Sequence, residues 1–202
     1  NSPESKSPLG NLSKERTRMT KDLTTGSPMR LILGFTLPTL LGMLFQQLYN
    51  MMDTMIVGKL LGATALAAVG STGSLNFFVI GFCMGVCNGF AIPVAQRMGA
   101  GDFSQMRGYV ANAAWLAIAF AAVLTVATGL LCGTILTTMR TPADIYDGAY
   151  WYIFIIFMGI PATFLYNLLA AIIRSLGDSR TPVYFLLLSS VINILLDLFT
   201  II

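Results

Sequence analysis

The stretch LILGFTLPTLLGMLFQQLYNMM, residues 31–52, decides the fold, because it contains no charged side chain. A helix needs about 20 apolar residues to cross the hydrocarbon core of a bilayer. The stretch is too long for a single strand and lacks the alternation of apolar and polar residues that a half-buried strand shows. We therefore expect a transmembrane helix over residues 29–52.

Charge-free windows recur along the rest of the chain, at residues 60–96, 108–139, 148–173 and 181–196. Hydrophobic residues make up 55% of the chain and charged residues only 10%, whereas a typical soluble domain carries about 25% charged residues. These values exclude an ordinary soluble domain. The sequence predicts an all-α fold, a polytopic transmembrane helix bundle with helices at about 29–52, 66–92, 108–136, 149–173 and 182–202.

Residues 1–27 differ from the rest of the chain, since they are polar and rich in Pro, Ser and Gly. Such a segment cannot bury enough apolar area to fold alone, so we expect a disordered tail. Of the 12 Lys and Arg residues, only Lys59 and Arg140 fall in the connections on the opposite side of the membrane from this tail. Basic residues favour the cytoplasmic side, which places the tail in the cytoplasm and the protein in the cell membrane. The net charge of +3 reflects this topology and does not indicate a nucleic-acid partner.

Small residues at intervals of four predict close helix packing in two spans. They are Gly81, Gly85 and Gly89 in the second span, and Ala113, Ala117 and Ala121 in the third. The three cysteines, Cys83, Cys87 and Cys132, all fall inside spans, and we interpret them as packing residues. Pro38 and Pro161 lie inside the first and fourth spans, where proline is expected to bend a helix.

Polar side chains inside the first and last spans carry the functional interpretation. Asp53 follows the first span, and Asn193 and Asp197 lie one helical turn apart in the fifth. A carboxylate at the centre of a membrane helix costs about 2.5–3.5 kcal/mol, so it usually faces a cavity or a partner. Two carboxylates and an amide can take up a proton or bind Na⁺. The alternatives are that Asp53 is an interfacial residue at a helix end, and that the fifth span ends near Asp197.

Further polar and aromatic residues are candidates for the lining of a cavity. Gln46, Gln47, Asn50 and Tyr49 stand in the last turns of the first span, and Phe45, Phe77 and Tyr166 lie at other places in the spans. For the aromatic residues, packing or lipid-facing roles are the alternative. The chain contains no His and no nucleophile motif within the spans, which argues against an enzyme.

Four stretches, in order, resemble the multidrug and toxic compound extrusion (MATE) family. They are LPTLLGMLFQQLYNMMDTMIVGKLLGATALAAVG at 37–70, PVAQRMGAGD at 93–102, RSLGDSRTP at 174–182 and NILLD at 193–197. The resemblance implies an efflux pump of twelve helices, built as two six-helix lobes that face the membrane the same way. On this basis we expect residues 28–202 to be the first lobe, truncated before its sixth helix and without the second lobe.

The resemblance also implies roles for particular residues. The family's cation site falls on Asp53, Asn193 and Asp197, with Tyr152, or Tyr150 in a competing alignment, and Pro38 matches a proline at which the first helix bends. We expect an antiporter that exports drugs or amphiphilic organic cations, with H⁺ or Na⁺ as the coupling ion and no other cofactor. The alternatives are a flippase of the same superfamily for a lipid-linked or polysaccharide substrate, and a membrane fragment that does not transport.

Overall fold

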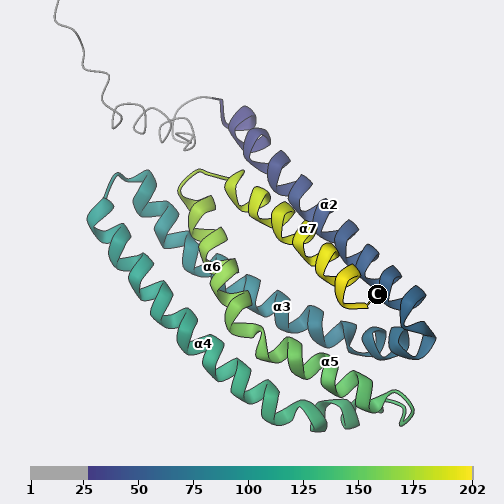
Figure 1. Cartoon of the computed structure of the whole chain (residues 1–202). Coiled ribbons are helices and arrows are strands. Elements are labelled where there is room, and N and C mark those ends of the chain that lie inside the picture. Colours follow the sequence, from purple (N-terminus) through teal and green to yellow (C-terminus); the bar gives the residue numbers. More distant parts are fainter. Residues whose placement is uncertain (1–26, 202) are drawn as a thin grey trace, which may run out of the picture.

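The computed structural model describes the backbone of residues 27–201, and the side chains in this range except those at positions 197, 198, 200 and 201. Within these residues the chain forms helices and no strands, which confirms the all-α prediction (Figure 1). The helices are α2 (Pro28–Leu60), α3 (Gly62–Gly99), α4 (Phe103–Thr138), α5 (Tyr146–Met158), α6 (Ile160–Ser175) and α7 (Thr181–Ile201).

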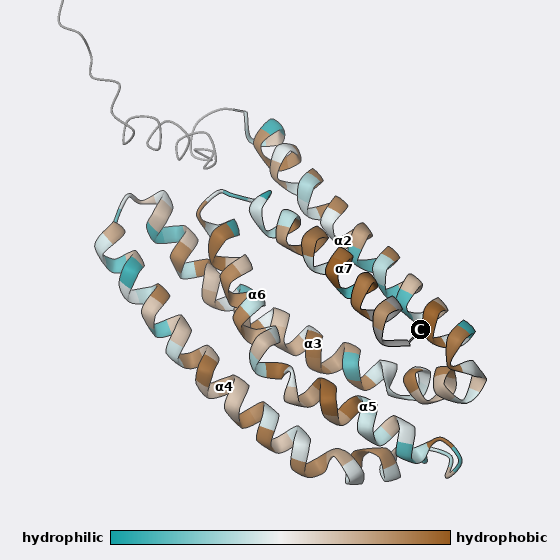
Figure 2. Cartoon of the chain, viewed as in Figure 1, coloured by the Kyte–Doolittle hydropathy of each residue, from teal (hydrophilic) through white to brown (hydrophobic). Residues whose placement is uncertain are grey.

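Three of these helices, α2, α3 and α4, are each long and apolar enough to cross a membrane. The pair α5 and α6 forms a fourth span if the bent pair is taken as one. In α7 the apolar stretch with described side chains, Thr181–Leu196, is shorter than a span. Many large apolar side chains are exposed on the helices. Hydrophobic positions predominate along the helices in Figure 2. This distribution fits a bundle surrounded by lipid.

The predicted single helix at 149–173 is divided into two, since α5 and α6 meet at Gly159 with a bend of 45°. Pro161 lies in the first turn of α6. Its ring nitrogen cannot donate a hydrogen bond to the carbonyl four residues earlier, so the helix breaks there. The helix α2, in contrast, runs through Pro38 without interruption. The bend predicted at Pro38 stays a prediction.

The helices form two groups that run side by side (Figure 1). In one group α3 packs against α4, α5 and α6, and in the other α2 packs against α7. The groups are joined because α2 also contacts α3 and α6 also contacts α7. The start of α2 and the connections α3–α4 and α6–α7 lie at one end of the bundle, and the connections α2–α3 and α4–α5 lie at the other.

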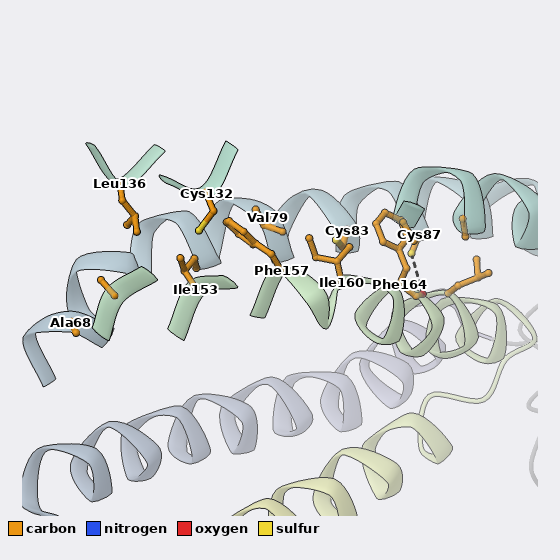
Figure 3. Close-up of a cluster of buried hydrophobic side chains, with 14 of the residues drawn as sticks. Ala68, Val79, Cys83, Cys87, Cys132, Leu136, Ile153, Phe157, Ile160 and Phe164 are labelled. Atoms are coloured by element: carbon orange, nitrogen blue, oxygen red, sulfur yellow. Dashed lines mark hydrogen bonds between the residues drawn. The ribbon is translucent and has the colours of Figure 1, made fainter. Parts of the chain in front are cut away.

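The core lies between α3, α4 and the broken pair α5–α6 (Figure 3). The alanine stripe of α4, at 113, 117 and 121, is buried there as predicted. All three cysteines are fully buried, which confirms their packing role. Cys87 contacts the Phe164 carbonyl of α6 at 3.7 Å through its sulfur.

The prediction for the glycines of α3 is wrong within the described chain. Gly81, Gly85 and Gly89 lie on an exposed face, and a Cβ added at any of them would meet no atom within 4 Å. The seam of α3 is formed instead by the stripe that includes Val79, Cys83 and Cys87. A period of four in the sequence identifies a face of a helix, but not the neighbour that the face meets.

The connections α3–α4 and α6–α7 lie at the same end of the bundle, and each contains a glycine followed by an aspartate just before the next helix. Gly101 and Gly177 adopt φ values of +72° and +91°, which glycine tolerates because it has no Cβ. Each is followed by an aspartate that accepts backbone hydrogen bonds from the next helix. Asp102 accepts from the Gln105 amide at 3.1 Å, and Asp178 accepts from the Arg180 and Thr181 amides at 2.9 and 3.0 Å.

Candidate cation-coupling site

The helices α2 and α7 run parallel and touch at a glycine. Gly42 is the buried residue of α2, and a Cβ added to it would lie 3.0 Å from a methyl group of Val183 in α7. The missing side chain therefore lets the two helices approach closely. Further along, the Tyr49 hydroxyl donates a 2.7 Å hydrogen bond to Oδ1 of Asn193. Both side chains are half-buried.

Asp53 stands one turn after Tyr49, on the same face of α2. Its side chain is half-buried, and it is close enough to Tyr152 of α5 to act electrostatically on the phenol. The competing tyrosine, Tyr150, has different surroundings, since its ring stacks on those of Tyr146 and Phe154. Of the two tyrosines named from the resemblance, Tyr152 is the one within electrostatic range of Asp53.

The side chain of Asp197 lies outside the described residues, so its contacts are not part of this geometry. Its backbone belongs to α7, one turn after Asn193. The two parallel helices rise by the same ~1.5 Å per residue. Because the Tyr49–Asn193 bond links the helices one turn before Asp53 and one turn before position 197, both positions lie in the next turn of their helices.

Other residues predicted for the cavity lie elsewhere. Gln47 and Asn50 line a separate groove of about 520 Å³, together with Lys59 of α2 and Leu66 of α3. Gln46 is exposed. Neighbouring positions of a helix are about 100° apart, so a polar cluster in the sequence is distributed over several faces. Among the predicted aromatic residues, Phe45 and Phe77 are exposed, and Tyr166 lines a cavity between α6 and α7.

The structure also draws attention to polar residues that the sequence analysis did not single out. Asn167 is half-buried in α6, and its amide donates to the Thr163 carbonyl at 2.8 Å. Buried Oδ1 of Asn76 and Oγ1 of Thr125 have no hydrogen-bond partner among the described residues. Each of these residues is an uncharged polar residue inside a charge-free window of the sequence, and a search for charged residues does not find it.

The chemistry of the donors suits a proton or a hard cation. Asp53 offers a carboxylate, and Tyr49, Asn193 and Tyr152 offer hydroxyl or amide oxygens. Oxygen ligands of this kind suit hard cations such as Na⁺, and a half-buried carboxylate can instead be neutralised by a proton. Within the described residues no group of three or more His, Cys, Asp and Glu side chains is arranged to hold a metal ion.

Comparison with known families settles which architecture this arrangement belongs to. The family model MatE matches residues 38–199, which include Asp53, Tyr152, Asn193 and Asp197. The chain belongs to the MATE family. The match covers all the helices from α3 to α6 and most of α2 and α7.

Curated relatives carry transporter names. The chain is 32% identical over 180 residues to the probable multidrug resistance protein YpnP of Bacillus subtilis, covering 87% of this chain and 39% of that protein. It is 34% identical over 162 residues to the probable multidrug resistance protein YoeA of the same organism, covering 80% and 35%. An FAD transporter of Shewanella oneidensis is 25% identical over 83% of this chain and 37% of that protein.

Solved structures agree with the family. A MOP superfamily transporter from Pyrococcus furiosus superimposes with a TM-score of 0.81 and 25% identity, over 88% of this chain and 40% of that one. A MATE structure in complex with MaD3S superimposes with a TM-score of 0.80 over the same shares. The 202 residues therefore span about 40% of the length of these relatives.

Proposed function

We propose that this chain is the first lobe of a cation-coupled antiporter, which exports drugs or other amphiphilic organic cations through the cell membrane. The coupling ion, H⁺ or Na⁺, binds at Asp53, with Asn193 and Asp197 of α7 and Tyr152 of α5. Residues 1–27 lie in the cytoplasm in this proposal. In this proposal a second lobe completes the substrate pathway.

One observation supports the proposal more than any other, namely the direct packing of α2 on α7 beside Asp53. The Tyr49–Asn193 hydrogen bond links the two helices one turn before Asp53, and Asp53 lies within electrostatic range of Tyr152 in the other group of helices. Charge at Asp53 is thus felt by both groups. A site that joins the two groups can favour one arrangement of the groups over another when its charge changes.

The mechanism follows from this position. When a cation binds, the negative charge of Asp53 is neutralised, and its interactions with neighbouring hydroxyl and amide groups change. The equilibrium between two packings of α2 and α7 against the other helices then shifts by the difference in the free energy of cation binding between them. Pro38, which leaves the carbonyl of Gly34 without its helical donor, is the point at which α2 can bend in one of these packings.

The proposal is tested with Asp53→Asn in a complete two-lobe transporter that carries this chain as its first lobe, reconstituted in proteoliposomes. The amide keeps the size of the side chain but cannot change charge. We expect efflux driven by an imposed pH or Na⁺ gradient to fall to about the background rate, while the amount of protein in the membrane stays the same.

The matched control is Asp144→Asn, which removes an exposed carboxylate from the α4–α5 connection at the same end of the bundle. This variant should transport at the normal rate. Undiminished gradient-driven efflux in Asp53→Asn would exclude Asp53 as the coupling residue. The 202-residue chain alone, assayed in the same way, shows whether the lobe transports without a second one.

A further inference from the structure

The side chain of Arg174 is half-buried and lies against α3. The sequence analysis placed this residue in a connection, but the structure places it in the last turn of α6. Its Nη2 donates a 3.4 Å hydrogen bond to Oδ1 of Asn88 in α3, and it lies within electrostatic range of Tyr166. Side chains on a helix lean toward the helix N-terminus, which explains the direction.

No carboxylate among the described residues pairs with this half-buried cation. The ion pair of the described chain joins Arg97 to Asp102, at 3.9 Å. Asp178, the acidic residue nearest in sequence, is engaged by the backbone amides of Arg180 and Thr181 and by the Thr181 hydroxyl. Removing a charge from water without a partner is costly. Arg174, with one long bond to a neutral amide, therefore has donors to offer to an anion.

An apolar cavity of about 390 Å³ lies between α6 and α7, and its lining extends to Ile173, the residue before Arg174. Its lining includes Tyr166, Leu169 and Ile173 of α6 and Phe185, Leu186 and Ser189 of α7. Tyr166 belongs to both features, because it lines the cavity and interacts with Arg174. From Pro182 at the start of α7 to Ser189, the cavity extends about 10 Å along the helix.

We propose that Arg174 and this cavity bind an anionic phospholipid, with the phosphate on the guanidinium and one acyl chain between α6 and α7. The end of α6 is the level at which headgroups meet a membrane helix, and the cavity runs from there toward the middle of the bilayer. A soluble anion would leave the cavity unfilled. A zwitterionic lipid carries a positive group that compensates its own phosphate, so the unpaired cation favours a lipid with net negative charge.

The proposal is tested by native mass spectrometry of the purified 202-residue chain in detergent, with added phosphatidylglycerol or phosphatidylcholine of the same acyl chains. We expect phosphatidylglycerol to bind at a lower lipid concentration than phosphatidylcholine does. Arg174→Gln should weaken its binding about tenfold, to the level of phosphatidylcholine, as the loss of one charge-assisted contact implies. Arg180→Gln, an exposed arginine of the neighbouring connection, should bind like the unchanged chain.

Two further arms make the test independent of Arg174. Leu186→Trp fills the cavity and should weaken the binding of both lipids, although Arg174 is intact. Glycerol 3-phosphate, which has the anionic group without the acyl chains, should not compete at equal concentration. Equal binding by Arg174→Gln and Arg180→Gln, or effective competition by glycerol 3-phosphate, would overturn the proposal. Because no transport is measured, the result is separate from that for the coupling site.

Discussion

At the scale of single residues, the contact that defines the candidate site is the hydrogen bond from Tyr49 to Asn193. It joins the first and the last of the described helices, through residues 144 positions apart in the sequence, and both partners are half-buried. The hydroxyl has no equivalent donor beside it on α2, since Gln46 is exposed and Asn50 faces the other groove. The bond therefore adds a directional contact to the apolar packing of α7 on α2.

Tyr49→Phe removes this hydroxyl and keeps the ring. We expect the chain to lose about 1 kcal/mol of unfolding free energy, because Oδ1 of Asn193 is left half-buried without this donor. Thermal unfolding in detergent, followed by circular dichroism, measures the change. Tyr184→Phe, which removes the hydroxyl of a tyrosine that is 65% exposed on α7, is the matched control. Equal unfolding curves for the two variants would show that the hydrogen bond adds nothing to stability.

A second prediction at this scale concerns the aspartates that begin helices. Asp178 accepts hydrogen bonds from two backbone amides and from the Thr181 hydroxyl, whereas Asp102 caps α4 through one amide. Asp178→Ala should destabilise the chain by about 1–2 kcal/mol. Asp102→Ala should cost less, and Asp178→Asn, which keeps an acceptor, should restore most of the loss. The same unfolding assay ranks the three variants, and a reversed order would contradict the capping roles.

At the scale of helices, the contacts depend on which residues have small side chains where two helices cross. Gly42 lies directly against Val183, while the glycine stripe of α3 faces outward. The break between α5 and α6 likewise depends on a few residues around Gly159. Gly159 caps α5, its amide bonding to the carbonyls of Ile155 and Ile156, and Pro161 starts α6. Across the 45° bend, both α5 and α6 pack along α3.

Gly42→Leu should separate α2 from α7, because even a single added carbon would meet the Val183 side chain at 3.0 Å. We expect the Tyr49–Asn193 contact to be lost and the unfolding free energy to fall by about 1–3 kcal/mol, as in other overpacked contacts. Spin labels on the two helices measure the separation. Gly81→Leu, on the open face of α3, is the control and should leave both quantities unchanged. An unaltered distance in Gly42→Leu would show that α7 is held elsewhere.

At the scale of the whole molecule, two groups of helices are connected by few contacts, and their ends differ in charge. Arg97, Arg107, Arg174 and Arg180 belong to the end where α2 begins. Lys59 and Arg140 are the basic residues of the opposite end. Large apolar side chains remain exposed on most helices, including Phe77 at 82% and Leu130 at 80%. Such surfaces are stable against lipid or against further helices and not in water.

The orientation of the bundle is testable with single exposed cysteines. The three native cysteines are fully buried, so they should not react with a membrane-impermeant maleimide. In intact cells we expect labelling of Asp144→Cys, in the α4–α5 connection, and no labelling of Ser104→Cys, in the first turn of α4, until the cells are opened. The opposite pattern would place the N-terminal tail outside the cell and would contradict the proposed topology.

The sequence by itself determined that the chain is helical, that it lies in a membrane and where its main helices fall. These properties depend on runs of apolar residues and on the spacing of charges, both of which are local. Asp53, Asn193 and Tyr152 could also be named, but only through the resemblance to a family. The division of the fourth span at Gly159 was indicated by Pro161, although the sequence did not give the size of the bend.

Only the tertiary structure decided which faces of the helices meet. It buried the cysteines, exposed the glycines of α3 and placed Gln47 and Asn50 in another groove. It also placed the side chain of Arg174 against Asn88 of α3. The physical reason is that rotation of a helix about its axis is set by the partners that it packs against. Those partners come from distant parts of the chain, so no short window of sequence contains them.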